Sequence, residues 1–179
     1  MIPEALIHKY YAGQPQLEEL LLIHSRQVAE KALRICDAHP ELKLDRSFLH
    51  EAAMLHDIGI LRTDAPGILC FGNEPYIRHG IIGGEILRLE GLPRHARVAE
   101  RHTGTGLTIS QIEGQHLPLP LQDFSPETLE EQVVCYADKF YSKSKLETEK
   151  TPERVLRSLE RFGTEGVNRF LQWHRIFAI

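Results

Sequence analysis

The eight residues AAMLHDIG, at positions 52–59, place a histidine and an aspartate next to each other at the end of an apolar stretch. Asp45 can cap a helix over residues 46–58, in which apolar side chains and His56 recur at the i, i+3, i+4, i+7 spacing of a buried helix face. The glycine that closes the stretch is a common helix stop. The spacing therefore predicts that His56 faces the protein interior, with Asp57 beside it.

Three further predicted helices each carry one histidine on an apolar face. These are His24 in a helix over residues 16–37, His79 in a helix over residues 76–90, and His102 in a short helix that Pro93 begins. A single histidine on an apolar face is usually a core residue whose ring nitrogens bond to a neighbour. Four of them in one small core, together with an adjacent aspartate, are not explained by packing alone.

Helix signals continue through the second half of the chain. The Ser-Pro pair at 125–126 begins a predicted helix that runs to about residue 142 and places Asp138 beside its apolar stripe. Two more helices are predicted over residues 152–163 and 165–177. Strand signals are almost absent, so the sequence indicates an all-α protein.

Two segments resist assignment to helices, residues 60–75 and 103–124. Both are rich in glycine, proline and polar residues, and we expect them to be loops at the rim of a pocket. The length suits one hydrophobic core. We therefore predict a single-domain helical bundle over residues 1–179, with a motif-bearing core at about 20–145 and C-terminal helices at 152–178.

Composition and charge exclude several classes of protein. The formal net charge of -4 disfavours binding to a long nucleic acid, whose backbone needs many cations, but it leaves a small anionic substrate open. No apolar run is long enough to cross a bilayer, and the first residues lack the pattern of a secretory signal, so a cytoplasmic protein without membrane contact is expected. The three cysteines form no close pair and are expected to stay reduced.

The aspartate next to His56 needs a positive partner if it is buried. A buried carboxylate is costly unless it is paired with a cation or bound to a metal, and no lysine or arginine lies in register with Asp57 on its own helix face. A divalent ion answers this need, since it binds neutral imidazoles and carboxylates together. A nitrogen and oxygen ligand set without thiolates does not distinguish among Fe, Mn, Zn, Co, Ni and Mg.

The order of these motifs resembles that of the HD-domain metal phosphohydrolases, and specifically their HDIG branch. The resemblance implies that His24, His56, Asp57 and Asp138 bind one metal ion. It further implies that His79 and His102 bind a second ion, which Asp57 then shares with the first, and we favour two ions over one. The segments that carry the resemblance are LLIHSRQVA at 21–29, AAMLHDIG at 52–59, RHG at 78–80, AERHTG at 99–104 and YADKFYSK at 136–143.

The activity that the resemblance implies is hydrolysis of a nucleotide or other small phosphate ester by a hydroxide that the metal activates. Asp57 and Asp138 are then the catalytic carboxylates, with Asp138 orienting the nucleophile. Four cations close to the proposed ligands are candidate substrate contacts, although each is also explained as a solvated helix face. These cations are Arg78, Arg101, Lys139 and Lys143.

One position departs from the family pattern. Several two-metal relatives place a phosphate-binding lysine shortly after the HD pair, where this sequence has Ile60 and Leu61. Arg62 is the nearest candidate to replace that lysine. The departure favours a phosphate monoester or a polyphosphate over a phosphodiester.

Two other functional classes stay open at this point. The same ligand order also resembles that of HD-fold di-iron oxygenases, which differ from hydrolases in consuming dioxygen. A metal-stabilised signalling module without catalysis is the third interpretation, although it leaves a full ligand set without a purpose. The sequence leaves a homo-oligomer open as well.

Overall fold

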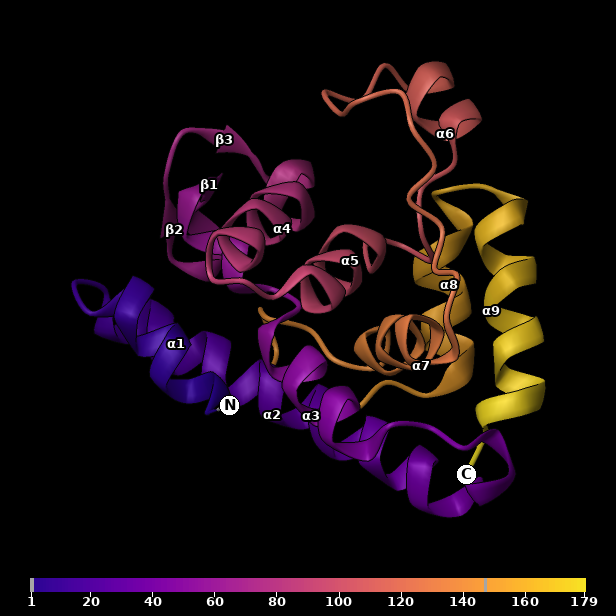
Figure 1. Cartoon of the computed structure of the whole chain (residues 1–179). Coiled ribbons are helices and arrows are strands. Elements are labelled where there is room, and N and C mark those ends of the chain that lie inside the picture. Colours follow the sequence, from indigo (N-terminus) through magenta and orange to yellow (C-terminus); the bar gives the residue numbers. More distant parts are fainter. Residues whose placement is uncertain (1, 147) are drawn as a thin grey trace.

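The computed structural model describes residues 2–146 and 148–179, and these residues fold mainly into helices (Figure 1). The all-α fold predicted from the sequence is confirmed. None of the described helices combines the length and the apolar character that a bilayer crossing needs. The α-helices are α1 (Pro3–Tyr11), α2 (Pro15–Ala38), α3 (Arg46–Leu55), α4 (His79–Leu89), α5 (Pro93–Arg101), α6 (Ile109–Gly114), α7 (Leu129–Asp138), α8 (Pro152–Glu160) and α9 (Thr164–Phe177).

The main core lies where α2, α3, α5 and α7 pack together. Their inward faces carry the apolar residues at helical spacing that the sequence predicted, and Leu21, Val28, Leu49 and Val133 have no exposed surface. The helix α4 packs closely along α5. The core therefore brings together the ends of helices that are far apart in the sequence.

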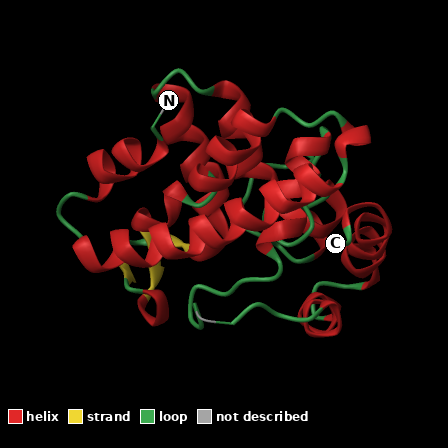
Figure 2. Cartoon of the chain, turned by 90° about the horizontal axis from the view of Figure 1, so that it is seen from below, coloured by secondary structure: helices red, strands yellow, loops and turns green. Residues whose placement is uncertain are grey.

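The segment 60–75 is not the plain loop that we expected. It begins with a 3-10 helix, Ile58–Arg62, and continues into a small sheet of β1 (Thr63–Ala65), β2 (Cys70–Phe71) and β3 (Glu74–Pro75). The strand β1 lies in the middle, antiparallel to β2 and parallel to β3, and Figure 2 shows the three strands in yellow. Strands of two or three residues are too short to show an alternating pattern, so the sequence could not reveal them.

Two predicted helix boundaries were wrong. The helix that carries the HD pair was predicted over residues 46–58, but α3 ends at Leu55, so the HD pair lies in the turn beyond it. The helix expected to begin at 125–126 begins instead after Thr128, whose hydroxyl accepts from the backbone N–H of Glu131 while the Glu131 carboxylate accepts from the Thr128 N–H. This reciprocal capping box is a stronger start signal than the earlier Ser-Pro pair.

The other segment without a prediction, 103–124, contains the short helix α6. It lies apart from the main core at the top of Figure 1. A second apolar cluster of Leu107, Ile112 and Phe124 holds this region together, with Ile77 and Leu117 packed against it. The region therefore forms a wall beside α4 and α5, which agrees with the expectation that it lies at the rim of a pocket.

The chain beyond α7 returns to the core through α8 and α9, which lie side by side at the yellow end of the chain in Figure 1. The connection over residues 139–150 begins directly after Asp138 and ends where the backbone N–H of Lys150 donates to the Phe140 carbonyl at 2.8 Å. On α9, Phe170 and Phe177 pack against the ring of Tyr136 from α7. The three cysteines are free thiols, as predicted.

The backbone at Gly59 has no room for a side chain. A methyl group there would overlap the His79 carbonyl oxygen and the backbone nitrogen of Gly83, because the turn after α3 touches α4 directly. We predict that Gly59→Ala lowers the free energy of unfolding by about 3 kcal/mol or more, since neither backbone can move freely. Urea unfolding measures the change. Gly13→Ala is the matched control, because nothing lies within 4 Å of that site, and an equal loss in both variants would contradict the prediction.

Candidate metal centre

Four of the predicted ligands meet in one buried group. His24 comes from the middle of α2, Asp138 is the last residue of α7, and the HD pair occupies the turn after α3. One ligand atom from each of these four residues lies within 4.8 Å of the others. All four are buried, and His24, His56 and Asp57 have no exposed surface.

A second group shares Asp57 with the first. His79 is the first residue of α4, His102 directly follows α5, and their ring nitrogens lie within 4.8 Å of each other and of an Asp57 oxygen. The two oxygens of Asp57 divide between the groups. Its Oδ2 lies 3.1 Å from Nε2 of His24 and of His56, and its Oδ1 lies 3.2 Å from Nε2 of His102.

Three of the histidine rings are oriented in the same way. The Nδ1–H of His56, His79 and His102 donates to the backbone carbonyl three residues earlier, at 2.6, 2.6 and 2.7 Å. This bond fixes the neutral ring in the tautomer that carries its lone pair on Nε2. Each of these rings therefore directs Nε2 toward the centre of the cluster, where the neutral ring presents a lone pair.

The convergent lone pairs fit a metal ion better than a hydrogen-bond network. Nε2 of His79 lies 3.0 Å from Nε2 of His102, a contact in which two neutral rings of this tautomer have no proton to share. His56 Nε2 and Asp57 Oδ2 are buried and make no hydrogen bond of normal geometry. Bonds of about 2.0–2.2 Å to one ion place neighbouring ligand atoms roughly 3.0–3.5 Å apart. The cluster could therefore hold a divalent metal.

Two lysines pair with the carboxylates, and the sequence analysis missed both pairings. Lys143 Nζ lies 2.6 Å from Asp57 Oδ2, and Lys139 Nζ lies 2.8 Å from Asp138 Oδ2. Burial lowers the pKa of His56, but Asp57 and Asp138 outweigh burial and raise that pKa to about 9, so a metal ion has to displace a proton from this ring. Burial raises the pKa of Asp57, but the charges of Lys143 and His56 outweigh it and hold that pKa well below its usual value. Burial acts on the pKa of Asp138 in the same way and is outweighed by Lys139. Both carboxylates are therefore ionised at neutral pH.

The histidines of the second group are neutral at physiological pH. Burial and, to a smaller extent, the neighbouring His102 lower the pKa of His79 to about 3. Burial also lowers the pKa of His102, more than the adjacent Asp57 raises it. Neutral imidazole is the form that binds a metal, so these two rings are ready to act as ligands without losing a proton.

Two of the four candidate substrate cations lie away from the cluster. Arg78 donates to the Pro118 carbonyl at 2.9 Å and pairs with Glu74, and Arg101 donates to the Ser125 carbonyl and pairs with Glu127 at 3.1 Å. Neither lines the cavities beside the cluster. Lys139 and Lys143 line both of these cavities, so they are the cations that the structure brings to the site.

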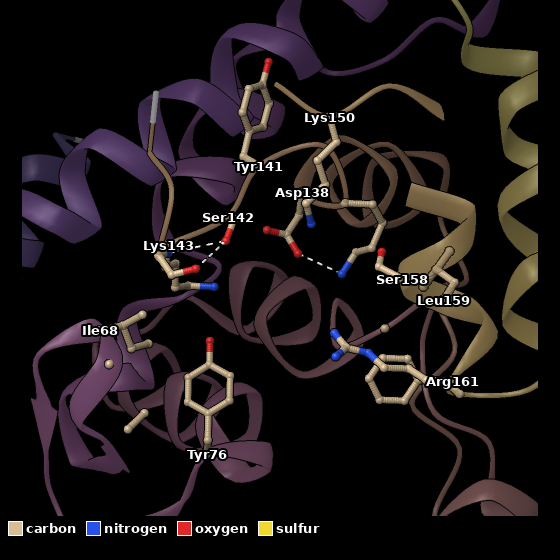
Figure 3. A pocket seen from close by; sticks show the side chains of 16 residues that line it. Ile68, Tyr76, Asp138, Tyr141, Ser142, Lys143, Lys150, Ser158, Leu159 and Arg161 are labelled. Carbon is tan, nitrogen blue, oxygen red and sulfur yellow. Dashed lines mark hydrogen bonds and ion pairs between the residues drawn. The ribbon is translucent and has the colours of Figure 1, made fainter. Parts of the chain in front are cut away.

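Two adjoining cavities open beside Asp138. The larger, of about 460 Å³, is lined mainly by polar and cationic side chains (Figure 3). The smaller, of about 300 Å³, reaches His79 and His102 and is lined largely by apolar residues of the α6 region and α8. The residues common to both include Tyr76, Asp138 and Lys143. The two cavities therefore form one two-lobed cleft with the cluster at its junction.

The sequence analysis did not identify several residues that line this cleft. Tyr76 stacks on the ring of His79, with ring centroids 4.6 Å apart, and lines both lobes. Lys150 and Arg161 line the larger lobe from the connection after α7 and from the end of α8. The only sequence signal for them is their charge near the last motif, which does not distinguish a cleft residue from a solvated one.

Comparison with known proteins places the chain in a family. The HD-domain model matches residues 21–142, which include all six residues of the cluster. The chain belongs to the HD-domain family, as its sequence motifs predicted. No solved structure matches it.

Three relatives are similar to this chain in sequence. Two of them carry the name tRNA (cytidine(56)-2'-O)-methyltransferase. The one from Picrophilus torridus is 36% identical over 130 residues, which are 72% of this chain and 33% of that protein. The one from Thermoplasma volcanium is 33% identical over 141 residues, which are 78% of this chain and 36% of that protein. An uncharacterized protein of Methanocaldococcus jannaschii is 36% identical over 124 residues, 64% of this chain and 66% of that protein. The chain thus spans about a third of the two named relatives.

The contact between Lys143 and Asp57 predicts a competition with metal binding. A lysine cation 2.6 Å from a proposed ligand oxygen repels a divalent ion at the same place. We predict that Lys143→Met tightens binding of Mn²⁺ by at least about tenfold, measured by isothermal titration calorimetry at one pH. Lys145→Met, which removes an exposed lysine of the same connection, should leave the affinity unchanged. Weaker binding in Lys143→Met would contradict the prediction.

Proposed function

We propose that this chain is a metal-dependent phosphohydrolase that acts on a nucleotide or another small phosphate ester. The observation that carries the proposal is the shared aspartate: Asp57 turns one oxygen to each of two buried ligand groups. Beside the cluster, the cleft offers cations to an anionic substrate. This combination suits attack by water on a phosphoryl group.

The proposed number of ions is two. His24, His56, Asp57 and Asp138 would hold the first ion, and Asp57, His79 and His102 would hold the second. The mixed set of imidazoles and carboxylates, with Cys135 as a core thiol rather than a ligand, suits Mn, Fe, Co, Ni or Zn. When bound, divalent ions supply a water of lowered pKa and positive charge for the phosphoryl oxygens.

The chain's own groups would orient the reaction. Asp138 lies where the cluster meets the cleft, and its ionised carboxylate can accept a hydrogen bond from the attacking water. Lys139 and Lys143 direct their ammonium groups to the same junction, where they can donate to phosphoryl oxygens as negative charge develops on them. Tyr76 covers the His79 ring and limits access of bulk water.

The smaller lobe supports a substrate with an apolar body. Its lining includes Leu107, Leu117 and Phe162, which suit the face of a nucleobase. Gln111 adds an amide at the same wall; its oxygen accepts from the Thr108 N–H at 2.9 Å, which leaves its N–H₂ to donate to a base edge. A nucleotide with its base in this lobe would present its phosphate to the cluster.

Methyl transfer, which the names of two relatives describe, is not extended to this chain. The match covers about a third of each of those proteins, and their names refer to the whole protein rather than to the matched part. The chemistry of this chain's cluster, buried imidazoles around a shared carboxylate, favours water activation instead. The names of the two relatives do support the inclusion of RNA-derived nucleotides in the panel of substrates to be tested.

The first test removes the shared carboxylate. We predict that purified protein loaded with Mn²⁺ or Fe²⁺ releases phosphate or a nucleoside from a panel of nucleotides, and that Asp57→Ala lowers the rate by about a thousandfold or more. Phosphate release is measured with and without a chelator. Asp64→Ala removes an exposed aspartate of β1 and should leave the rate unchanged.

Two outcomes would overturn the assignment. Turnover that persists in Asp57→Ala would place the chemistry elsewhere. Turnover that requires dioxygen would support the di-iron oxygenase, since hydrolysis should continue under anaerobic conditions and with Zn²⁺, which has no redox chemistry.

The second test counts the ions. We predict that the wild type holds two metal ions per chain and that His79→Ala holds one, because the first group keeps all four of its ligands. Elemental analysis of dialysed protein measures the ratio. Replacing His95 with alanine is the matched control, because that partly buried histidine bonds to Glu51 rather than to the cluster. Equal metal content in the wild type and His79→Ala would contradict the two-ion proposal.

A further inference from the structure

Two of the four cations that line the larger lobe of the cleft form no ion pair in the described part of the chain. Lys139 and Lys143 line this lobe and pair with Asp138 and Asp57. Lys150 and Arg161 line it too, but within residues 2–146 and 148–179 neither forms an ion pair. Figure 3 shows Arg161 and Lys143 on opposite sides of the cavity, with Asp138 between them.

The unpaired cations lie close enough to repel one another. Burial lowers the pKa of Lys150 and Asp138 raises it, but the positive charges of Lys139, Arg161 and Arg154 act against Asp138, and the pKa stays below its usual value. Arg154, Ser158 and Arg161 follow the i, i+4, i+7 spacing that places them on one face of α8, and Ser158 also lines the cavity. A crowd of like charges around a cavity destabilises the fold unless an anion binds there.

The carboxylates of the cluster do not act as the anion that these cations need. The two carboxylates Asp57 and Asp138 are already balanced by Lys143 and Lys139. Any divalent ion adds positive charge to this balanced set. A phosphate at the junction would therefore meet the cluster and its two lysines, and the cations on the α8 side would still lack a partner.

We propose that Lys150 and Arg161, with Arg154 behind them, form a subsite for a second phosphate, so that the substrate is a phosphate ester carrying two phosphates. The proposal rests on the proposed function, because it extends the same cleft. The first phosphate lies at the junction beside Asp138, and the second lies against the end of α8. Ser158 offers a hydroxyl at the same wall. Since α8 lies outside the matched residues 21–142, this chain adds the subsite to the family's core.

The test measures binding rather than turnover. Metal-loaded protein is titrated by calorimetry with methylenediphosphonate, which carries two phosphonates and resists hydrolysis, and with methylphosphonate, which carries one. We expect Arg161→Met to weaken the binding of methylenediphosphonate by about tenfold or more, which is the effect of losing one charge-assisted hydrogen bond. Its affinity for methylphosphonate should stay within about twofold. Lys150→Met should give the same pattern.

Arg157→Met is the matched control. Arg157 lies on α8 too, but it does not line the cavity and its charge acts on Glu153 instead. It should leave the affinity for both ligands unchanged. Equal effects of Arg161→Met on the two phosphonates, or no effect on either, would overturn the subsite. Thermal unfolding of each variant shows that the comparison is between folded proteins.

A separate measurement identifies which kind of substrate carries the second phosphate. A nucleoside 5'-diphosphate carries its phosphates in one chain, whereas a nucleoside 3',5'-bisphosphate carries them on two sides of the sugar. We expect one of the two to exceed the nucleoside 5'-monophosphate in kcat/KM, and the higher value identifies the source. A monophosphate preferred over both would overturn the proposal. If the wild type hydrolyses no substrate but Arg161→Met and Lys150→Met still lose diphosphonate binding selectively, the subsite is supported and the proposed hydrolase activity is refuted.

Discussion

The structure depends on one buried carboxylate, Asp57, whose two oxygens face two sets of imidazole nitrogens. The middle of α2 and the ends of α3, α4, α5 and α7 all meet at this residue, so the packing of five helices depends on its charge. A buried carboxylate left without a partner would cost several kcal/mol. Lys143 neutralises it at 2.6 Å, and the surrounding rings turn their lone pairs to the same place. The core is therefore organised around a charge rather than around apolar contact alone.

The helices and the cluster could be predicted because their signals are local or periodic. His24, His56, His79 and His102 each close an apolar stripe, and a stripe of that kind fixes which face of a helix is buried. The helix boundaries were less predictable. The Thr128 capping box overrode the earlier Ser-Pro signal, and the strands of β1 to β3 were too short to leave a pattern.

Lys139 and Lys143 were predicted as cations near the site, but their pairing with the carboxylates could not be predicted, for a different reason. Lys143 and Asp57 are distant in sequence, and their contact depends on how the connection after α7 turns back. Arg78 and Arg101, which adjoin predicted ligands in sequence, point instead to Glu74 and Glu127. Adjacency along a chain fixes the position of a backbone, whereas the direction of a long side chain follows from the partners that the fold supplies.

The connection over residues 139–150 joins two parts of the cleft that differ in origin. Its first residue follows the ligand Asp138, and its last backbone N–H closes onto Phe140 before α8 begins. Length changes within this stretch would move Lys150 and the arginines of α8 relative to the cluster while leaving every proposed ligand in place. If the cleft binds an anion as proposed, such changes would alter the size of that anion independently of the cluster, which makes this connection the natural place for relatives to diverge in substrate choice.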